Sequence, residues 1–233
     1  MLQFLHLPEE TIDNQFIPKK HFYEHGNLNK KEKELFVKVI KRITLYAQLK
    51  TEDTNIPIYK DEQKTYEEVA ILFVELRVDN HLEKLAKIIM ELIPYPMILI
   101  FTYNEMVNFV GAHQRDNLQD STKIILEAVY QTGFISQEDK FMNQIDYKKF
   151  DKQNFYTFYE DYIQLIISYN LKIRNVKEAE DNELLLEEIR RLEEEIKRLR
   201  NRLKREKQFN RKMDINMKIK ILEAKLKKMG GIS

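Results

Sequence analysis

Residues 68–77 read EVAILFVELR, and they predict the centre of the fold. From Val69 to Val74 every residue is apolar, and most are β-branched or aromatic. A short apolar run of this kind is typical of a strand that is buried on both faces of a sheet. The charged residues Glu75 and Arg77 then mark the end of that strand.

The next elements along the chain extend this sheet. Residues 82–92 (LEKLAKIIMEL) have helical apolar spacing, and the Pro-rich residues 93–96 end the helix because proline removes a backbone donor. Residues 97–103 and 106–114 are two apolar runs joined by the tight connection Asn104-Glu105. They predict a β-hairpin.

Further helices are predicted on either side of this region. Apolar residues at helical spacing predict an amphipathic helix over residues 30–49, with Asn29 as its N-cap. Residues 122–132 also have a helical pattern, and residues 154–170 predict a dense aromatic helix that packs on the body. Residues 1–28, rich in turn residues, predict an irregular segment laid over the body.

The fold class is therefore a mixed α/β (α+β) body with a small sheet over residues 1–170, followed by a tail over residues 176–229. The small sheet comprises residues 68–77, 97–103 and 106–114. The tail is a coiled coil or a helical hairpin.

The tail carries two runs of apolar residues at coiled-coil spacing. Their registers differ on either side of residues 208–210, so the helix either continues through a stutter or turns back as an antiparallel hairpin. The lack of Gly or Pro there favours continuity. Such a seam predicts contact with a partner helix through Leu185, Ile189, Leu192, Ile196, Leu199, Leu203, Ile215, Ile219, Leu222 and Leu226.

Charge is divided unevenly along the chain. The formal net charge is +1 overall, but residues 1–170 carry −6 and residues 171–233 carry +7. Residues 197–212 include nine Lys and Arg residues and one Glu. This segment would be about 24 Å long if helical. The predicted nucleic-acid-binding residues are Lys197, Arg198, Arg200, Arg202, Lys204, Arg205, Lys207, Arg211 and Lys212. The alternative is a solvated flank of the coiled coil.

One short motif resembles catalytic chemistry. Restriction-type nucleases place Glu-x-Lys at a strand end, where it holds a divalent cation and polarises water. Glu75 is the catalytic candidate on this basis, but Arg77 is a poor substitute for the lysine, and no Asp-bearing strand precedes it. The alternative is a strand end with solvated charges.

Other classes of site find no support in the sequence. The chain has no cysteine, no phosphate-binding loop and no dinucleotide fingerprint. Of its five histidines, His21 and His25 have an i,i+4 spacing, but no third ligand supports them. We therefore predict no cofactor and no metal. No apolar run is long enough to span a membrane, and the acidic start lacks a secretion signal, so we expect a cytoplasmic protein.

Several pieces, in order along the chain, carry a family resemblance. They are residues 7–8, 17–19, 22–23, 74–77, 93–96, 112–115, 206–212 and 215–216. Together they resemble a bacterial family of domains of unknown function, commonly encoded beside DNA methyltransferases and helicases in restriction-modification or phage-defence loci. Arg77 departs from the lysine frequent in that family. The resemblance implies a helicase or methyltransferase partner, and it brings no catalytic residues.

These observations favour a non-catalytic accessory subunit of a DNA-directed restriction or phage-defence system. It would bind a protein partner through the seam and nucleic acid through the basic segment. The alternatives are a metal-dependent nuclease that uses Glu75, and a coiled-coil homodimer without a DNA role.

Overall fold

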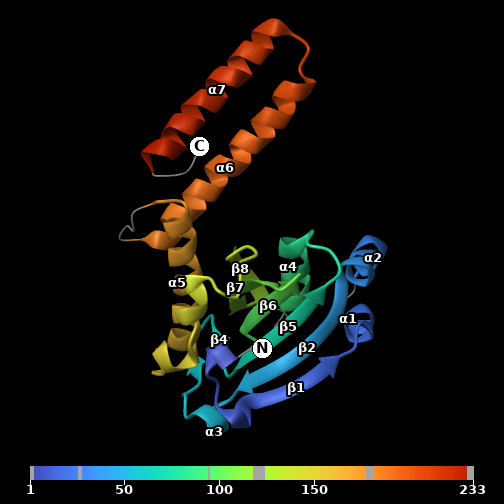
Figure 1. Cartoon of the computed structure of the whole chain (residues 1–233), viewed down its shortest axis with the longest axis vertical. Helices are drawn as coiled ribbons and strands as arrows, with labels where there is room; N and C mark the ends of the chain where they lie inside the picture. Colours follow the sequence, from blue (N-terminus) through green and yellow to red (C-terminus); the bar gives the residue numbers. More distant parts are fainter. Residues whose placement is uncertain (1–2, 26–27, 94, 118–123, 177–180, 230–233) are drawn as a thin grey trace. The chain divides into compact units, whose positions relative to one another are not determined.

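The computed structural model describes residues 3–25, 28–93, 95–117, 124–176 and 181–229. The chain divides into two compact units, Met1–Ile166 and Ile167–Ser233. The first unit is built on a six-stranded mixed sheet, and the second contains two long helices (Figure 1). No helix in the described ranges is both long enough and apolar enough to cross a membrane.

The sheet of the first unit has the strand order β1-β2-β5-β6-β7-β8. Its strands are β1 (Ile12–Ile17), β2 (Ile40–Leu49), β5 (Val69–Leu76), β6 (Met97–Tyr103), β7 (Met106–Asp116) and β8 (Ile124–Gln131). β5 and β6 are parallel, joined through α4 (Leu82–Leu92), and the other pairs are antiparallel. The predicted buried strand, the helix after it and the β6–β7 hairpin are confirmed.

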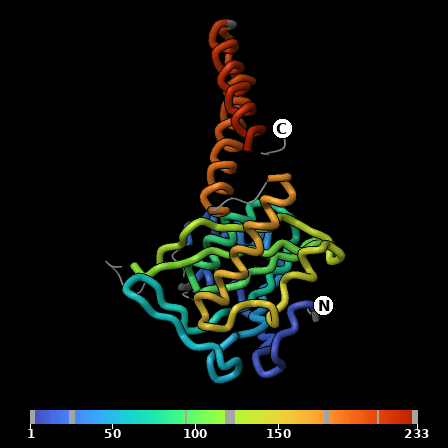
Figure 2. Tube along the Cα trace, turned by 90° about the vertical axis from the view of Figure 1, so that its left-hand side faces the viewer, coloured from blue at the N-terminus to red at the C-terminus, as the bar shows by residue number. Residues whose placement is uncertain are grey.

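Helices cover both faces of this sheet. α1 (Lys19–His25), α2 (Lys30–Val39) and α4 lie on one face, where their apolar residues join the core. The first part of α5 (Phe155–Ile173) lies across the other face (Figure 2). Shorter elements complete the unit: η1 (Gln3–Leu5), η2 (Glu9–Thr11), α3 (Thr51–Thr54), β3 (Tyr59–Lys60), β4 (Thr65–Tyr66), η3 (Lys140–Asn143) and η4 (Tyr147–Lys149).

Three sequence predictions about this unit are wrong. The helix predicted over residues 30–49 ends at Val39, and Ile40–Leu49 forms β2 between β1 and β5. Residues 124–131 of the helix predicted over 122–132 form strand β8; residues 122–123 lie outside the described ranges. Residues 1–28 contain β1 and α1. Sheet pairing, which the local apolar pattern does not encode, selects the strands β1, β2 and β8.

The contact between α5 and the sheet depends on Gly111. A Cβ atom at Gly111 would lie 2.6 Å from Ile163 Cδ1 and 2.7 Å from Tyr162 Cε1. The Tyr162 ring is held in place because its hydroxyl donates a 3.0 Å hydrogen bond to the carbonyl of Val110. Only glycine therefore fits between this helix and β7.

We predict that Gly111→Ala lowers the free energy of unfolding by about 1–3 kcal/mol, since a buried methyl group overpacks this contact. Urea denaturation followed by tyrosine fluorescence measures it, because eleven of the twelve tyrosines lie in residues 1–166. Ile163→Val removes the nearest clashing atom. The double variant should thus be less destabilised than the sum of the two single variants. Strict additivity would contradict the steric explanation.

The second unit contains an antiparallel helical hairpin formed by α6 (Asn182–Arg205) and α7 (Phe209–Lys228). We call it the tail hairpin. Ion pairs join the two helices, Lys225 Nζ to Glu188 Oε1 at 2.6 Å and Arg200 Nη2 to Glu223 Oε1 at 2.7 Å. The hairpin alternative is therefore the observed one, and the expected continuity through residues 208–210 is wrong.

A side chain makes this turn without Gly or Pro. Glu206 Oε1 accepts hydrogen bonds from the backbone N–H groups of Lys207 and Gln208, at 2.9 and 3.0 Å. These bonds lower the pKa of Glu206, the bond from Gln208 contributing most. Local bonding of this kind competes with helical hydrogen bonding and ends α6 at Arg205.

Candidate functional site

The tail hairpin gathers positive charge around its turn. We call the eleven Lys and Arg residues between residues 197 and 220 the basic tip. Nine are the predicted nucleic-acid-binding residues, and α7 adds two more: Lys197, Arg198, Arg200, Arg202, Lys204, Arg205, Lys207, Arg211, Lys212, Lys218 and Lys220. All eleven are exposed, and only Glu206 and Asp214 oppose them in this segment, which leaves a net charge of +9.

Few of these cations are neutralised. Arg200 pairs with Glu223, and Arg198 Nη2 lies 3.4 Å from Glu194 Oε2 in an exposed pair one turn apart. Within the part of the chain that the structure describes, the other nine form no ion pair. Because exposed ion pairs are weak, most of the positive charge of the tip remains uncompensated.

The dimensions of the basic tip suit a polyanion. The twelve residues of α7 up to Lys220 span about 18 Å, and a packed helix lies beside them roughly 10 Å away. A DNA duplex of that length carries about ten phosphates. The antiparallel return of α7 therefore adds four cations to the six on α6 and the one in the turn.

The ten residues predicted to bind a partner line this same hairpin. Ile189, Leu192 and Ile196 are buried on α6, and Ile215, Ile219 and Leu226 are buried on α7. The remaining four are partly buried: Leu185, Leu199, Leu203 and Leu222. The chain itself thus covers these apolar faces, one helix against the other.

The structure places Glu75 beside a groove at the carboxyl ends of β5 and β6. The groove encloses about 710 Å³, and its lining includes Glu105 and Glu138. Glu75 Oε2 lies 3.0 Å from Lys41 Nζ, so its nearest charged partner is a lysine. Among the described residues no group of three or more His, Asp or Glu side chains is arranged to hold a metal ion.

Arg77, the third residue of the Glu-Leu-Arg motif, makes hydrogen bonds to the backbone within the fold. Its Nη1 donates hydrogen bonds to the carbonyl oxygens of Val37, at 2.9 Å, and Ile40. These carbonyls lie where α2 ends and β2 begins. A guanidinium there satisfies acceptors that a helix end leaves unpaired.

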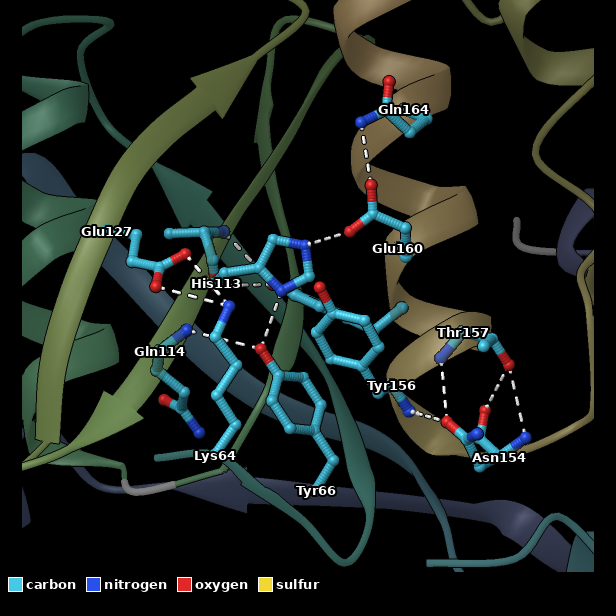
Figure 3. Close-up of polar contacts among 12 residues, drawn as sticks. Lys64, Tyr66, His113, Gln114, Glu127, Asn154, Tyr156, Thr157, Glu160 and Gln164 are labelled. Carbon is cyan, nitrogen blue, oxygen red and sulfur yellow. Dashed lines mark hydrogen bonds and ion pairs between the residues drawn. The ribbon is translucent and has the colours of Figure 1, made fainter. Parts of the chain in front are cut away.

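Sequence reasoning missed a buried polar cluster around His113 (Figure 3). The His113 side chain is 6% exposed and lies on β7, where the register with β8 shifts between Ala112 and Gln114. Two residues of β8, Glu127 and Ala128, therefore lie opposite His113 alone. Irregularities of this type re-aim side chains and occur next to functional sites.

Both ring nitrogens of His113 have partners. Nδ1 lies 2.7 Å from the Tyr66 hydroxyl, and Nε2 lies 2.8 Å from Glu160 Oε2 on α5. The Tyr66 oxygen accepts a 3.4 Å hydrogen bond from the Gln114 N–H, and burial raises the pKa of Tyr66. Tyr66 therefore keeps its proton and can donate it to Nδ1.

Further contacts orient the carboxylate and the surroundings. Gln164 Nε2 donates a 2.8 Å hydrogen bond to Glu160 Oε1. Lys64 Nζ lies 3.3 Å from Glu127 and 5.3 Å from the centre of the Tyr156 ring. Asn154 caps α5 by accepting from the N–H groups of Tyr156 and Thr157, which fixes the start of the helix that carries Glu160.

The cluster joins three separate elements: β4 through Tyr66, β7 through His113 and α5 through Glu160. Because Nδ1 lies 2.7 Å from the Tyr66 hydroxyl and Nε2 lies 2.8 Å from Glu160 Oε2, the histidine holds these three elements together as a polar clamp. The sequence feature that could have revealed the cluster is that His113 lies on the same side of an apolar strand as Phe109 and Gly111. Its partner, Glu160, is an acidic residue on the aromatic helix.

The hydrogen bond from His113 lowers the pKa of Glu160, and the bond from Gln164 adds to this against partial desolvation. The folded-state pKa thus lies below the unfolded value of about 4.3. The stabilisation from this carboxylate is present above that pH, and it is lost as the pH falls through the folded-state value.

We predict that Glu160→Gln lowers the free energy of unfolding by about 1–2 kcal/mol at neutral pH, because it removes a charged, partly exposed hydrogen-bond partner. It should also flatten the acid limb of the stability profile. Urea denaturation from pH 3 to 8 tests both points. Glu83→Gln is the control, since its pair with Lys87 is exposed and should change stability by less than about 0.5 kcal/mol. Equal effects of the two variants would contradict a structural clamp.

A family model described as "Domain of unknown function (DUF4391)" matches residues 5–226. The chain belongs to this family. The DUF4391 match covers the sheet, α5 and most of the tail hairpin, so both units are part of the family domain. Comparison with curated proteins and with solved structures gave no match.

Proposed function

We propose that this DUF4391 protein is an accessory subunit that binds the backbone of nucleic acid through the basic tip. The observation that carries this proposal is the packing of two basic helix segments side by side around one turn. Nine of their eleven cations are free of ion pairs within the described residues. The resemblance to proteins encoded beside DNA methyltransferases and helicases supports a DNA-directed restriction or phage-defence system as its setting.

The chemistry of the tip favours backbone contact without sequence readout. Lysine and arginine on exposed helices neutralise phosphates and release counterions, which makes affinity strongly dependent on salt. The length of the tip matches about ten phosphates of a duplex, so a duplex is the expected ligand.

This protein would act together with a protein that supplies the chemistry, for which a helicase or a methyltransferase is the candidate. The hairpin gives such a partner a second point of attachment to DNA. A weak, sequence-independent contact of this kind raises the effective concentration of the partner's own site on the same duplex.

We predict that the full chain binds a fluorescent duplex of about 20 base pairs with an affinity that falls steeply as salt increases. The triple variant Lys204→Gln/Lys207→Gln/Lys212→Gln should weaken binding about tenfold or more near physiological salt. It should also reduce the slope of log K against log salt by roughly 2–3, because each lost phosphate contact contributes about 0.9. Fluorescence anisotropy between about 50 and 200 mM NaCl measures both quantities.

A matched control removes the same number of positive charges from another part of the chain. Lys30→Gln/Lys33→Gln/Lys38→Gln removes three exposed lysines from α2 in the first unit. This variant should retain the parental slope and affinity within about twofold. An equal loss of affinity in both triple variants would show that binding comes from general charge attraction and not from the tip. Unchanged binding in the tip variant would refute the proposal.

A further inference from the structure

The outer face of α7 carries an apolar stripe that no part of the described chain covers. Met213, Met217 and Ile221 are 51%, 60% and 65% exposed. They are spaced four residues apart, so they lie along one side of the helix over about 12 Å. We call them the α7 stripe.

The stripe is distinct from the hairpin contact. Ile215, Ile219 and Leu226 are buried on the opposite side of the same helix, where α7 contacts α6. At 100° per residue the two sets are separated by about half a turn. α7 is therefore apolar on two sides, one packed within the hairpin and one open.

Lysines border the open side. Lys218 and Lys225 lie along one edge of the stripe, and Lys220 and Lys227 lie along the other. Lys225 pairs with Glu188, and Asp214 is the acidic exception on the flank. Lys218, Lys220 and Lys227 form no ion pair within the described residues.

We infer that the α7 stripe binds an amphipathic helix of a partner protein, with acidic residues on both sides of that helix's apolar face. The apolar stripe supplies the contact area, and the flanking lysines select carboxylates. Methionine supports this role because its flexible thioether side chain adapts to a partner's surface. This inference rests on the stripe and does not depend on nucleic-acid binding by the basic tip.

The charge pattern disfavours a second copy as the occupant. Two α7 stripes facing each other would bring lysine rows together on both edges, and like charges in contact are destabilising. The acidic half of α6 offers carboxylates, but its exposed apolar residue is Leu184 alone. An anionic membrane is also disfavoured, because the stripe is short and has no aromatic anchor among its members.

The test uses synthetic helical peptides of about 20 residues as probes. The first peptide has a leucine stripe flanked by glutamates. The second keeps the leucines and replaces the flanking glutamates with lysines. The third keeps the glutamates and replaces the leucines with glutamines. The full chain should bind the first peptide at least about tenfold more tightly than either of the others near 150 mM salt.

Variants then locate the binding surface. Met217→Gln/Ile221→Gln should weaken binding of the first peptide about tenfold or more. Leu184→Gln, which removes a comparably exposed apolar side chain from α6, should change it less than about twofold. Circular dichroism should show unchanged helix content in both variants, since the substituted side chains face solvent.

Several outcomes would overturn the inference. They are equal binding of the first and third peptides, preference for the second, no binding at all, stripe-dependent self-association in sedimentation velocity, or stripe-dependent binding to phosphatidylserine vesicles in place of peptide. The Lys204→Gln/Lys207→Gln/Lys212→Gln variant separates the two proposals. It should lose duplex binding and keep peptide binding within about threefold.

Discussion

Burial of β5 and β6 on both faces is the constraint on which the first unit depends. An apolar strand with no solvated side needs a layer of helices above and below the sheet. α2 and α4 provide one layer. The other is α5, whose tyrosines also donate hydrogen bonds into the sheet, Tyr159 to the carbonyl of Met97 at 2.8 Å and Tyr162 to that of Val110. These bonds satisfy carbonyl oxygens at the contact with the helix, and Gly111 permits the close approach.

The same constraint explains the His113 cluster. A polar side chain on the face of β7 beneath α5 is acceptable only when its hydrogen-bonding groups are satisfied. Tyr66 and Glu160 meet the two nitrogens from opposite sides, so the cluster fixes where β4 and α5 lie on the sheet. Lys64 and Glu127 add charge at the partly exposed rim. The cluster is thus a set of specific polar contacts within a largely apolar layer.

Sequence predicted those parts of the fold in which local pattern and tertiary structure agree. The run 69–76, the helix 82–92 and the hairpin across Asn104-Glu105 need only local information. Residues 40–49 and 124–131 satisfy helical and strand periods alike, and only pairing with β1, β5 or β7 selects the strand. The hairpin was one of two predicted alternatives, and continuity was favoured over it because a side chain, Glu206, makes the turn in place of Gly or Pro. The histidine cluster was missed because its members are about 50 residues apart.

The tail hairpin combines two surfaces that share charge. Lys218 and Lys220 belong to the basic tip and also border the α7 stripe. An acidic helix on the stripe would therefore place carboxylates close to cations that we propose contact nucleic acid, and would lower the positive potential of the tip. If both proposals hold, the two ligands must oppose each other, since a coupling between sites is reciprocal. Nucleic acid bound to the tip would lower the affinity for the partner helix by the same factor. Under these two proposals, Lys218 and Lys220 would let the hairpin exchange a protein contact for a nucleic-acid contact.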